Sequence, residues 1–454
     1  MDDARDKLIL QLRERIRQQQ EVILRHQGVI EQLQAKVGQL ERQIGQVESG
    51  KGKAKGMPGN KLEATKPPAE QAPRKKRERN FVRVRSVPTH RVEHALDECT
   101  ECGTRLTHGS TKRTREVIDV PLLPATVTEH VFIERRCYKC GQRCVPKDVL
   151  GDVAVGKSRL GVGLQSLIAS LREVGRLPIA TIRWYLDTFH SLSLSRGAIV
   201  AVLKGVAGKA RRAVEGIHQA VRESPWVCAD ETGWREDGRN GFAWTFSTPE
   251  VRLFVRAGRD KGVVERMLEG FGGTLVSDFY AAYNVYMGSH QRCWPHLLRD
   301  IHELRELHPE NKHLQLWARQ VHQVYEQAKL YAELATQDER QRLDTRLYFE
   351  RRLLQVCQPY LEDKQAIEHV LSKRIERYIK ELFVFVSQPG VPSDNNGAER
   401  SLRHLVTARK ISGGTRSLAG TETKMTLASV FGTWTAQGLN PFSQCIQLLK
   451  SPQP

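Results

Sequence analysis

Three acidic residues lie where predicted strands end or where a predicted helix begins. Asp230 and Asp278 each end a short apolar run, and Glu399 follows Ser393 and Asp394, either of which can cap a helix. Carboxylates that are forced together repel one another unless a cation lies between them. Hard oxygen ligands of this kind suit Mg²⁺ or Mn²⁺. The trio therefore predicts a site for metal-dependent, in-line phosphoryl transfer.

The pattern around these acids predicts a sheet that brings two of them together. The expected elements are three antiparallel strands, a helix, and a fourth strand beside the first, at residues 226–232, 241–247, 251–255, 259–271 and 273–278. In this layout the first and fourth strands are neighbours. Asp230 and Asp278, 48 residues apart in sequence, then meet at one edge of the sheet.

Each acid also has an ordinary structural interpretation. Asp230 can be a turn residue at a strand end, and Asp278 can cap a helix that begins at Phe279. Glu399 can pair with Arg403 one helical turn later, which contributes a few tenths of a kcal/mol. The three positions together, in a basic chain with paired cysteines, favour the catalytic interpretation.

Four cysteines form two Cys-x-x-Cys pairs, Cys99 with Cys102 and Cys137 with Cys140, and a glycine follows each pair. Two such knuckles supply four thiolates, the usual ligand set of a structural zinc site. The apolar stretches between them predict strands at 117–121 and 125–133, so the region resembles a zinc ribbon. A redox dithiol is the alternative, although it does not explain two pairs. Cys144 is interpreted as a bystander.

Cys293 and His296 form a further Cys-x-x-His element. Two ligands without a second pair favour a structural role, and a second metal site stays open.

The charge of the chain indicates a polyanionic partner. Lys and Arg number 71 against 52 Asp and Glu, which gives a formal charge of +19. Such a field attracts DNA, RNA or anionic membranes. No apolar run reaches the ~18 residues that a membrane span needs, so nucleic acid is preferred and no membrane partner is expected. The odd count of nine cysteines and the paired knuckles indicate a reducing cytoplasm, close to the nucleoid.

Residues 1–48 carry a seven-residue repeat that predicts a parallel coiled coil. The first core position is held by Ile9, Ile16, Ile23, Ile30, Val37 and Ile44, and the second by Leu12, Gln19, His26, Leu33, Leu40 and Val47. We therefore expect a homo-oligomer, a dimer or a trimer. The alternative is a single amphipathic helix that docks on its own chain.

Basic side chains gather in two further places. Residues 49–92 are rich in Gly, Lys and Pro and predict a flexible tether, which either contacts DNA phosphates or only aids solubility. The candidate contacts there are Arg74, Lys75, Lys76 and Arg77. A second group around Gly413 and Gly414 is either a phosphate-binding patch or a solvated basic face: Arg400, Arg403, Arg409, Lys410 and Arg416.

Residues 158–222 alternate apolar and polar positions at helical spacing. One helix is expected to begin near Leu177 and another after Ser195, a favourable N-cap. The pair suggests a helix-turn-helix, and an ordinary helical bundle fits equally well.

Four stretches resemble the motifs of insertion-sequence-66-type transposases. They are Ala229–Arg235, Ser277–Tyr283, Asp394–Arg400 and Cys293–Asp300. The resemblance implies an RNase H-like core with a helical insertion before the last acid, and residues 301–385 fit that insertion. It also implies double-stranded DNA as partner, both the terminal inverted repeats of an element and the target, with small accessory proteins beside it.

The expected fold class is therefore multidomain α/β. In chain order we expect a coiled coil, a basic linker, a zinc ribbon, a helical segment, an RNase H-like catalytic domain and a helical tail, at 1–48, 49–92, 93–148, 158–222, 224–420 and 421–454. The expected activity is that of a DDE transposase, which cuts and rejoins DNA. The alternatives are a DNA-binding protein that does not cut and a structure-selective nuclease of the same fold.

Overall fold

The structure is a computed structural model that describes residues 87–115, 117–118, 123–146, 150–154, 158–333 and 338–451. The predicted coiled coil and the basic residues Arg74–Arg77 lie outside the described residues. The chain divides into two compact units, Met1–Val117 and Ile118–Pro454. Within the described residues, no helix combines the length and the apolar character that crossing a lipid bilayer requires.

The cysteine-rich region contains less strand than predicted. Its described strands are β1 (Arg135–Arg136) and β2 (Arg143–Cys144), which form a short antiparallel hairpin around the second knuckle. The strand expected at 125–133 is absent, so that prediction was wrong. Apolar residues there such as Val127 and Ile133 are exposed. No neighbouring strand in the described chain pairs with this segment, and apolar alternation alone does not supply a hydrogen-bonded partner.

The second unit continues with a 3-10 turn, η1 (Leu150–Asp152), and three helices. These are α2 (Val162–Glu173), α3 (Ile179–His190) and α4 (Arg196–Glu223). Ser195 caps α4 as expected, because its hydroxyl accepts the Ala198 N–H at 3.1 Å. α4 runs for 28 residues, and it contacts both the sheet and a helix near the C-terminus. A role of α3 and α4 in reading DNA stays a prediction.

The sheet has the predicted arrangement and one additional strand. β3 (Trp226–Glu236), β4 (Arg239–Ser247) and β5 (Arg252–Ala257) are antiparallel. Asp237 and Gly238 both have positive φ, as a tight two-residue hairpin turn requires. After α5 (Lys261–Met267), β6 (Thr274–Ser277) pairs in parallel with β3. The short strand β7 (His290–Arg292) was not anticipated; it follows η2 (Ala281–Val285) and completes the order β5-β4-β3-β6-β7.

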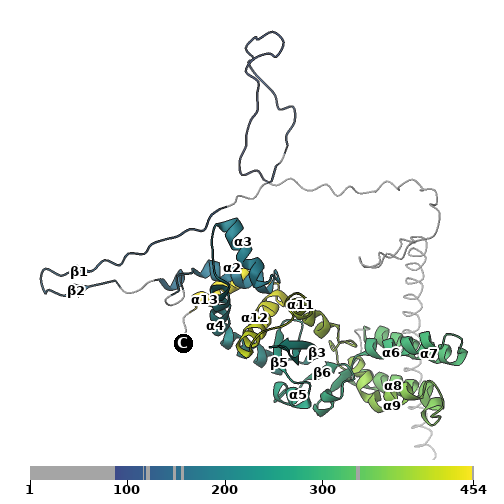
Figure 1. Cartoon of the computed structure of the whole chain (residues 1–454). Helices are drawn as coiled ribbons and strands as arrows, with labels where there is room; N and C mark the ends of the chain where they lie inside the picture. The colour runs from purple at the N-terminus through teal and green to yellow at the C-terminus, as the bar shows by residue number, and fades with distance from the viewer. Residues whose placement is uncertain are drawn as a thin grey trace, which may run out of the picture. The chain divides into compact units, whose positions relative to one another are not determined.

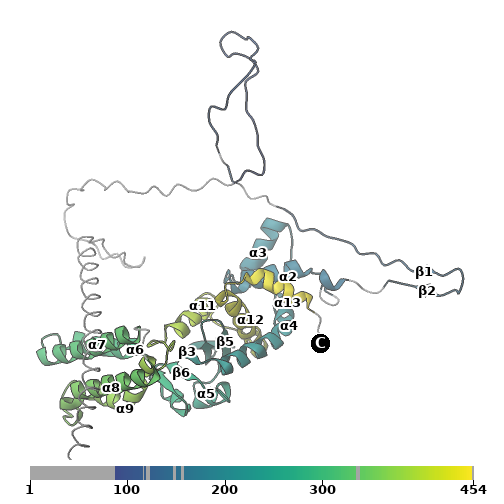
Figure 2. The same cartoon turned by 180° about the vertical axis from the view of Figure 1, so that it is seen from behind.

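The region expected as a helical insertion is helical and has its own core. It contains α6 (Trp294–Leu307), α7 (Lys312–Ala332), α8 (Glu339–Leu361), α9 (His369–Leu382) and α10 (Val384–Ser387). Large buried side chains such as Trp294, Trp317 and Phe383 fill it, and Cys228 and Val276 of the sheet join the same cluster. Figures 1 and 2 show these helices beyond the β6 side of the sheet, away from α2–α4.

The last helices fold back onto earlier parts of the chain. They are α11 (Asn396–Ser412), α12 (Leu418–Ala436) and α13 (Pro441–Lys450). α12 packs against β5 and α4, and α13 packs against α2, as both views show. The segment predicted as a tail at 421–454 is helical, but its side chains Leu427, Val430 and Phe431 belong to the main core.

Candidate active site

The three predicted acids come from three different elements around one end of the sheet. Asp230 lies within β3, where it pairs with Thr245 of β4. Asp278 directly follows β6, the parallel neighbour of β3. Glu399 lies in the first turn of α11, which contacts β3. The N-cap of the helix is Asn395, one residue after Asp394 and two after Ser393, the predicted caps.

The pKa of Asp230 is raised by its burial and by the neighbouring acids. Burial is the main reason that its pKa rises to about 7, and the carboxylates of Glu231, Asp278 and Glu399 raise it further. The Glu231 N–H, 2.9 Å from Asp230 Oδ1, acts in the opposite direction. Among the described residues, no three carboxylate, thiolate or imidazole groups converge as ligands of one metal ion. The acids share a neighbourhood and repel one another, and their oxygen donors are of the type that Mg²⁺ or Mn²⁺ binds.

The Asp278 loop is fixed by hydrogen bonds on both sides. Its carboxylate Oδ1 accepts the Tyr280 N–H at 2.9 Å, and its backbone carbonyl accepts from Arg292 Nη1 at 2.8 Å. The Tyr280 hydroxyl in turn donates to the Arg259 carbonyl at 3.0 Å. The position of Asp278 is therefore set by its neighbours rather than by a mobile loop.

Glu231, next to Asp230, is already occupied by protein partners. Its carboxylate pairs with Arg259 at 2.9 Å and accepts the Tyr283 hydroxyl at 2.8 Å, and its side chain is only 3 % exposed. The Arg259 guanidinium also lies 4.3 Å from the Tyr280 ring centroid. Burial raises the pKa of Tyr283 well above its ordinary value, so the hydroxyl remains a donor. Glu231 therefore links the Asp230 strand to the Asp278 loop.

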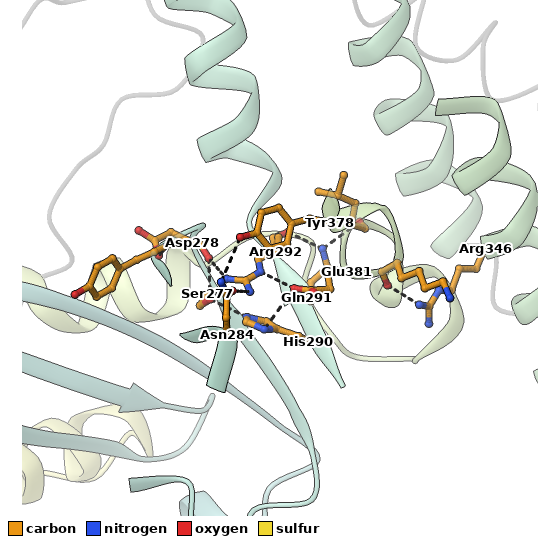
Figure 3. A network of polar contacts seen from close by, with 12 residues as sticks. Ser277, Asp278, Asn284, His290, Gln291, Arg292, Arg346, Tyr378 and Glu381 are labelled. Carbon is orange, nitrogen blue, oxygen red and sulfur yellow. Dashed lines mark hydrogen bonds and ion pairs between the residues drawn. The ribbon is translucent and has the colours of Figure 1, made fainter. Parts of the chain in front are cut away.

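A buried arginine connects the Asp278 loop to the helical insertion (Figure 3). Arg292, whose contacts the figure draws, is 1 % exposed. It donates to Glu381 of α9 at 2.6 Å, to Asn284 at 2.5 Å and to the Asp278 carbonyl, and it lies 4.7 Å from the Tyr378 ring centroid. His290 lies 3.5 Å from the same Glu381 carboxylate, and burial lowers the pKa of His290 well below its ordinary value. The fixed charges of this network are thus those of Arg292 and Glu381.

The start of α11 is anchored to β3 by Asn395. This fully buried side chain donates to the Ala229 carbonyl at 2.7 Å, directly before Asp230. Its backbone N–H donates to Cys293 Sγ at 3.2 Å. Gly397 allows a close approach, because a Cβ there would lie 3.3 Å from Cys228 Sγ. These contacts hold the first turn of α11 next to β3, so that Glu399 and Asp230 line the same cavity.

Cys293 and His296 play separate parts. Burial raises the pKa of the Cys293 thiol to about 12, so it is protonated at neutral pH and poorly suited to bind a metal. Its contact with Asn395 fits the structural role. His296 Nε2 instead lies 3.9 Å from Glu399 Oε1.

Two cavities, each of about 450 Å³, adjoin the acids. One is lined by Asp278 together with residues of α6 and α9. The other is lined by Asp230 and Glu399 together with Arg176 and Arg403. Positive side chains therefore lie on both sides of the carboxylates.

The predicted basic group on and after α11 divides into two kinds of residue. Arg400, Arg403, Lys410 and Arg416 are exposed. Arg409 is different, because it donates to the Gly233 carbonyl and to Thr232 Oγ1 and so joins α11 to β3. Gly414 has a φ of +105°, and a Cβ there would meet the Arg235 carbonyl at 2.1 Å. The glycine lets this loop pair with the end of β3 through Thr415.

The two cysteine knuckles have the same local geometry. In the first, Gly103 N–H donates to the Cys99 carbonyl at 3.0 Å; in the second, Gly141 N–H donates to the Cys137 carbonyl at 2.9 Å. Both glycines have positive φ, 71° and 74°. A hydrogen bond from Thr104 is the main cause that lowers the pKa of Cys102, and one from the Cys140 backbone lowers that of Cys137. Zinc binding by the four cysteines stays a prediction.

Several residues that position the acids were not found from the sequence. Glu231, Arg259 and Tyr283 lie in or near the acidic motifs, but their mutual contacts span 28 and 52 residues. Arg292 and Glu381 are 89 residues apart. The position of Glu231 next to Asp230 could have indicated a role at the site. Nothing in the sequence marks Arg292, which lies in the short polar strand β7.

Comparison with known proteins shows the family of the chain. Residues 157–423, more than half of the chain, match the family described as "Transposase IS66 family". A protein of Sinorhizobium fredii, "Uncharacterized protein y4jO", is 27 % identical over 198 residues, which cover 43 % of this chain and 58 % of that protein. The match thus spans little more than half the length of that relative. Because the family model covers more than half of the chain, the chain belongs to the IS66 transposase family.

Proposed function

We propose that this chain is a DDE transposase that cuts a DNA strand and joins its 3′ end to a target by metal-dependent phosphoryl transfer. Asp230, Asp278 and Glu399 would hold Mg²⁺ or Mn²⁺. The observation that carries this proposal is the origin of the three acids in β3, the end of β6 and the first turn of α11. Burial raises the pKa of Asp230, and the charges of Asp278 and Glu399 raise it further. The sheet order β5-β4-β3-β6-β7 supports an RNase H-like core.

The donor set suits the expected ions. All three side chains offer hard oxygen ligands, and a buried carboxylate among like charges is stabilised by a nearby cation. When bound, a metal pair supplies an activated water and stabilises the leaving 3′ oxygen. The chain's own residues position that chemistry: Glu231 and Arg292 fix the Asp278 loop, and Asn395 fixes α11.

We also propose that Cys99, Cys102, Cys137 and Cys140 bind structural zinc, and that the N-terminal repeat makes the protein a homo-oligomer. The matching geometry of the knuckles supports the first point. The second rests on the sequence alone. Accessory proteins remain an expectation from the family resemblance.

A direct test uses the full chain and a duplex that carries the ends of the element. With Mg²⁺ the wild-type protein should nick the duplex and join it to a plasmid target, and Asp230→Asn should do neither while it still binds the duplex. Mg²⁺ should also raise the melting temperature of the wild type and not that of Asp230→Asn. Cleavage by Asp230→Asn at the wild-type rate would refute the proposed site. Cleavage without joined products would indicate a nuclease.

A further inference from the structure

The cavity beside Asp278 brings the helical insertion to the catalytic acids. Its lining comes from three places: the loop Asp278–Tyr280 after β6, His296 and Asp300 of α6, and α9. The α9 side chains are Lys373, Arg374, Arg377 and Tyr378. We call this space the α9 cavity. It is separate from the basic group on α11, which the sequence had indicated.

The three cations of the α9 cavity are not equally engaged. Arg374 pairs with Asp300 of α6 and lies 5.6 Å from the Phe279 ring centroid, so it closes the cavity wall. Lys373 pairs with Glu376 at 3.2 Å and Glu362 at 3.6 Å, whose side chains are 44 % and 89 % exposed. Exposed pairs of this kind are weak and exchange readily with another anion.

Arg377 is the cation that is available to a ligand. It is exposed, and within the described part of the chain it has no ion-pair partner. Its guanidinium lies 5.3 Å from the ring centroid of the buried Tyr378. Stacking on an aromatic ring orients a guanidinium and leaves its N–H groups free to donate.

Buried side chains link Arg377 to the Asp278 loop. The Tyr378 ring that carries Arg377 also contacts Arg292, at 4.7 Å, and Arg292 donates to the Asp278 carbonyl at 2.8 Å. Glu381, one turn further along α9, accepts a hydrogen bond from Arg292. At Tyr378 the backbone leaves helical geometry, with φ −107° and ψ 15°. Arg377 is therefore connected through Tyr378 and Arg292 to the loop of the proposed catalytic acid Asp278.

We propose that the α9 cavity binds a backbone phosphate of the DNA strand next to the bond that is cut, with Arg377 as the main ligand and Lys373 as the second. This inference rests on the proposed function. A guanidinium fork matches two phosphate oxygens. Because Asp278 lines the same cavity, a strand whose scissile phosphate lies at the acids can place a neighbouring phosphate at Arg377. The insertion thus sets the register of the strand.

The test compares Arg377→Gln with Arg351→Gln in the full chain. Arg351 is exposed on α8 and does not line the cavity, so it controls for the same loss of charge. Each protein is titrated with duplexes that carry the element end and a single neutral methylphosphonate at successive positions around the cut. We expect Arg377→Gln to weaken binding about tenfold and to reduce the salt slope by about 1. One methylphosphonate should weaken the wild type and Arg351→Gln similarly, with no further loss in Arg377→Gln.

The outcomes separate this inference from the proposed function. If Arg377→Gln behaves like Arg351→Gln at every methylphosphonate position, the α9 cavity holds no phosphate. If the wild type binds the duplex but never cuts it, the proposed function fails. The DNA affinities still show whether residue 377 contacts one particular phosphate. Arg377→Lys keeps the charge and loses the fork. The DNA affinity of Arg377→Lys should lie between those of the wild type and Arg377→Gln. Wild-type affinity in Arg377→Lys would contradict a bidentate contact between Arg377 and the phosphate.

Discussion

At Asp230, burial and the charges of Glu231, Asp278 and Glu399 all favour the protonated carboxyl. The pKa of this acid therefore rises from 3.8 to about 7. The folded chain holds the proton more tightly than the unfolded chain, so this group lowers the free energy of unfolding as pH rises from about 4 to about 7. The proposed cation site thus reduces the stability of the chain when no cation is bound.

Asp230→Asn should consequently stabilise the protein while it removes activity. The amide keeps an oxygen that can accept the Glu231 N–H and carries no charge. We expect the free energy of unfolding at pH 8, without divalent ions, to rise by on the order of 2 kcal/mol. The gain should disappear at about pH 3, below the ordinary pKa of 3.8, where the wild-type acid is protonated in both states. Urea unfolding at both pH values measures it, and a variant less stable than wild type at pH 8 would contradict this account.

Arg292 acts at the scale of elements, because one guanidinium joins β7, the Asp278 loop and α9. Arg292→Met should leave Glu381 and the Asp278 carbonyl without their donor. Loss of one partner of a buried ion pair costs about 3 kcal/mol. We expect that loss in unfolding experiments, and a fall in kcat with a higher Mg²⁺ requirement.

Arg292→Lys serves as the comparison for Arg292→Met. It keeps the charge but has no planar fork, so it should recover part of the stability and less of the activity. If both variants lose stability but cut DNA with unchanged kcat and Mg²⁺ dependence, Arg292 only supports the fold and does not position Asp278.

The cysteine knuckles give a prediction for their own segment. The full chain should carry about one tightly bound zinc ion, and Cys102→Ser should lose it. Because each knuckle is a local turn, the catalytic domain should unfold with an unchanged midpoint in this variant, while DNA affinity falls. Metal analysis and thermal unfolding test this in one preparation. Full zinc content in Cys102→Ser would exclude the proposed ligand set.

Much of the sheet could be predicted because most of its strands are apolar runs separated by explicit turn residues. β3, β4, β5 and β6 were expected in their observed order. β7 was missed because its three residues, His290–Arg292, are polar and are buried only through partners such as Glu381. The strand at 125–133 was predicted wrongly, since alternation does not reveal whether a pairing partner exists.

The candidate site could be predicted only in part, for a related reason. Asp278 follows the end of β6 and Glu399 lies in the first turn of α11, which a sequence pattern can indicate. Asp230 was expected at a strand end but lies inside β3, because β3 continues to Glu236 as a hairpin with β4. The residues that position these acids act through contacts between distant segments, as with Arg292 and Glu381, 89 residues apart. The preference of Arg409 for the Gly233 carbonyl over solvent likewise depends on how α11 packs against β3. Residue type alone does not encode such choices.

At the scale of the whole second unit, a buried ion pair joins two helices that are far apart in sequence, α2 and α12. Lys424 of α12 lies 2.6 Å from Glu173 of α2, and the two side chains are 5 % and 2 % exposed. Burial is the main cause that lowers the pKa of Lys424, and Glu173 compensates for that cost. The pair joins residues 251 apart in sequence, so it fixes how α12 packs beside the helical segment.

Breaking this pair should destabilise the fold more than replacing it. Glu173→Gln leaves a buried ammonium without its counter-ion, and Lys424→Met leaves a buried carboxylate, so each should lower the free energy of unfolding by about 3–5 kcal/mol. The double variant should be more stable than either single variant, because no uncompensated charge remains. Urea unfolding of the four proteins gives the coupling energy, and the pair on the surface formed by Lys373 and Glu376 offers the matched control. Additive losses in the double variant would show that Lys424 and Glu173 do not depend on one another, and that apolar contacts alone hold α12 against α2.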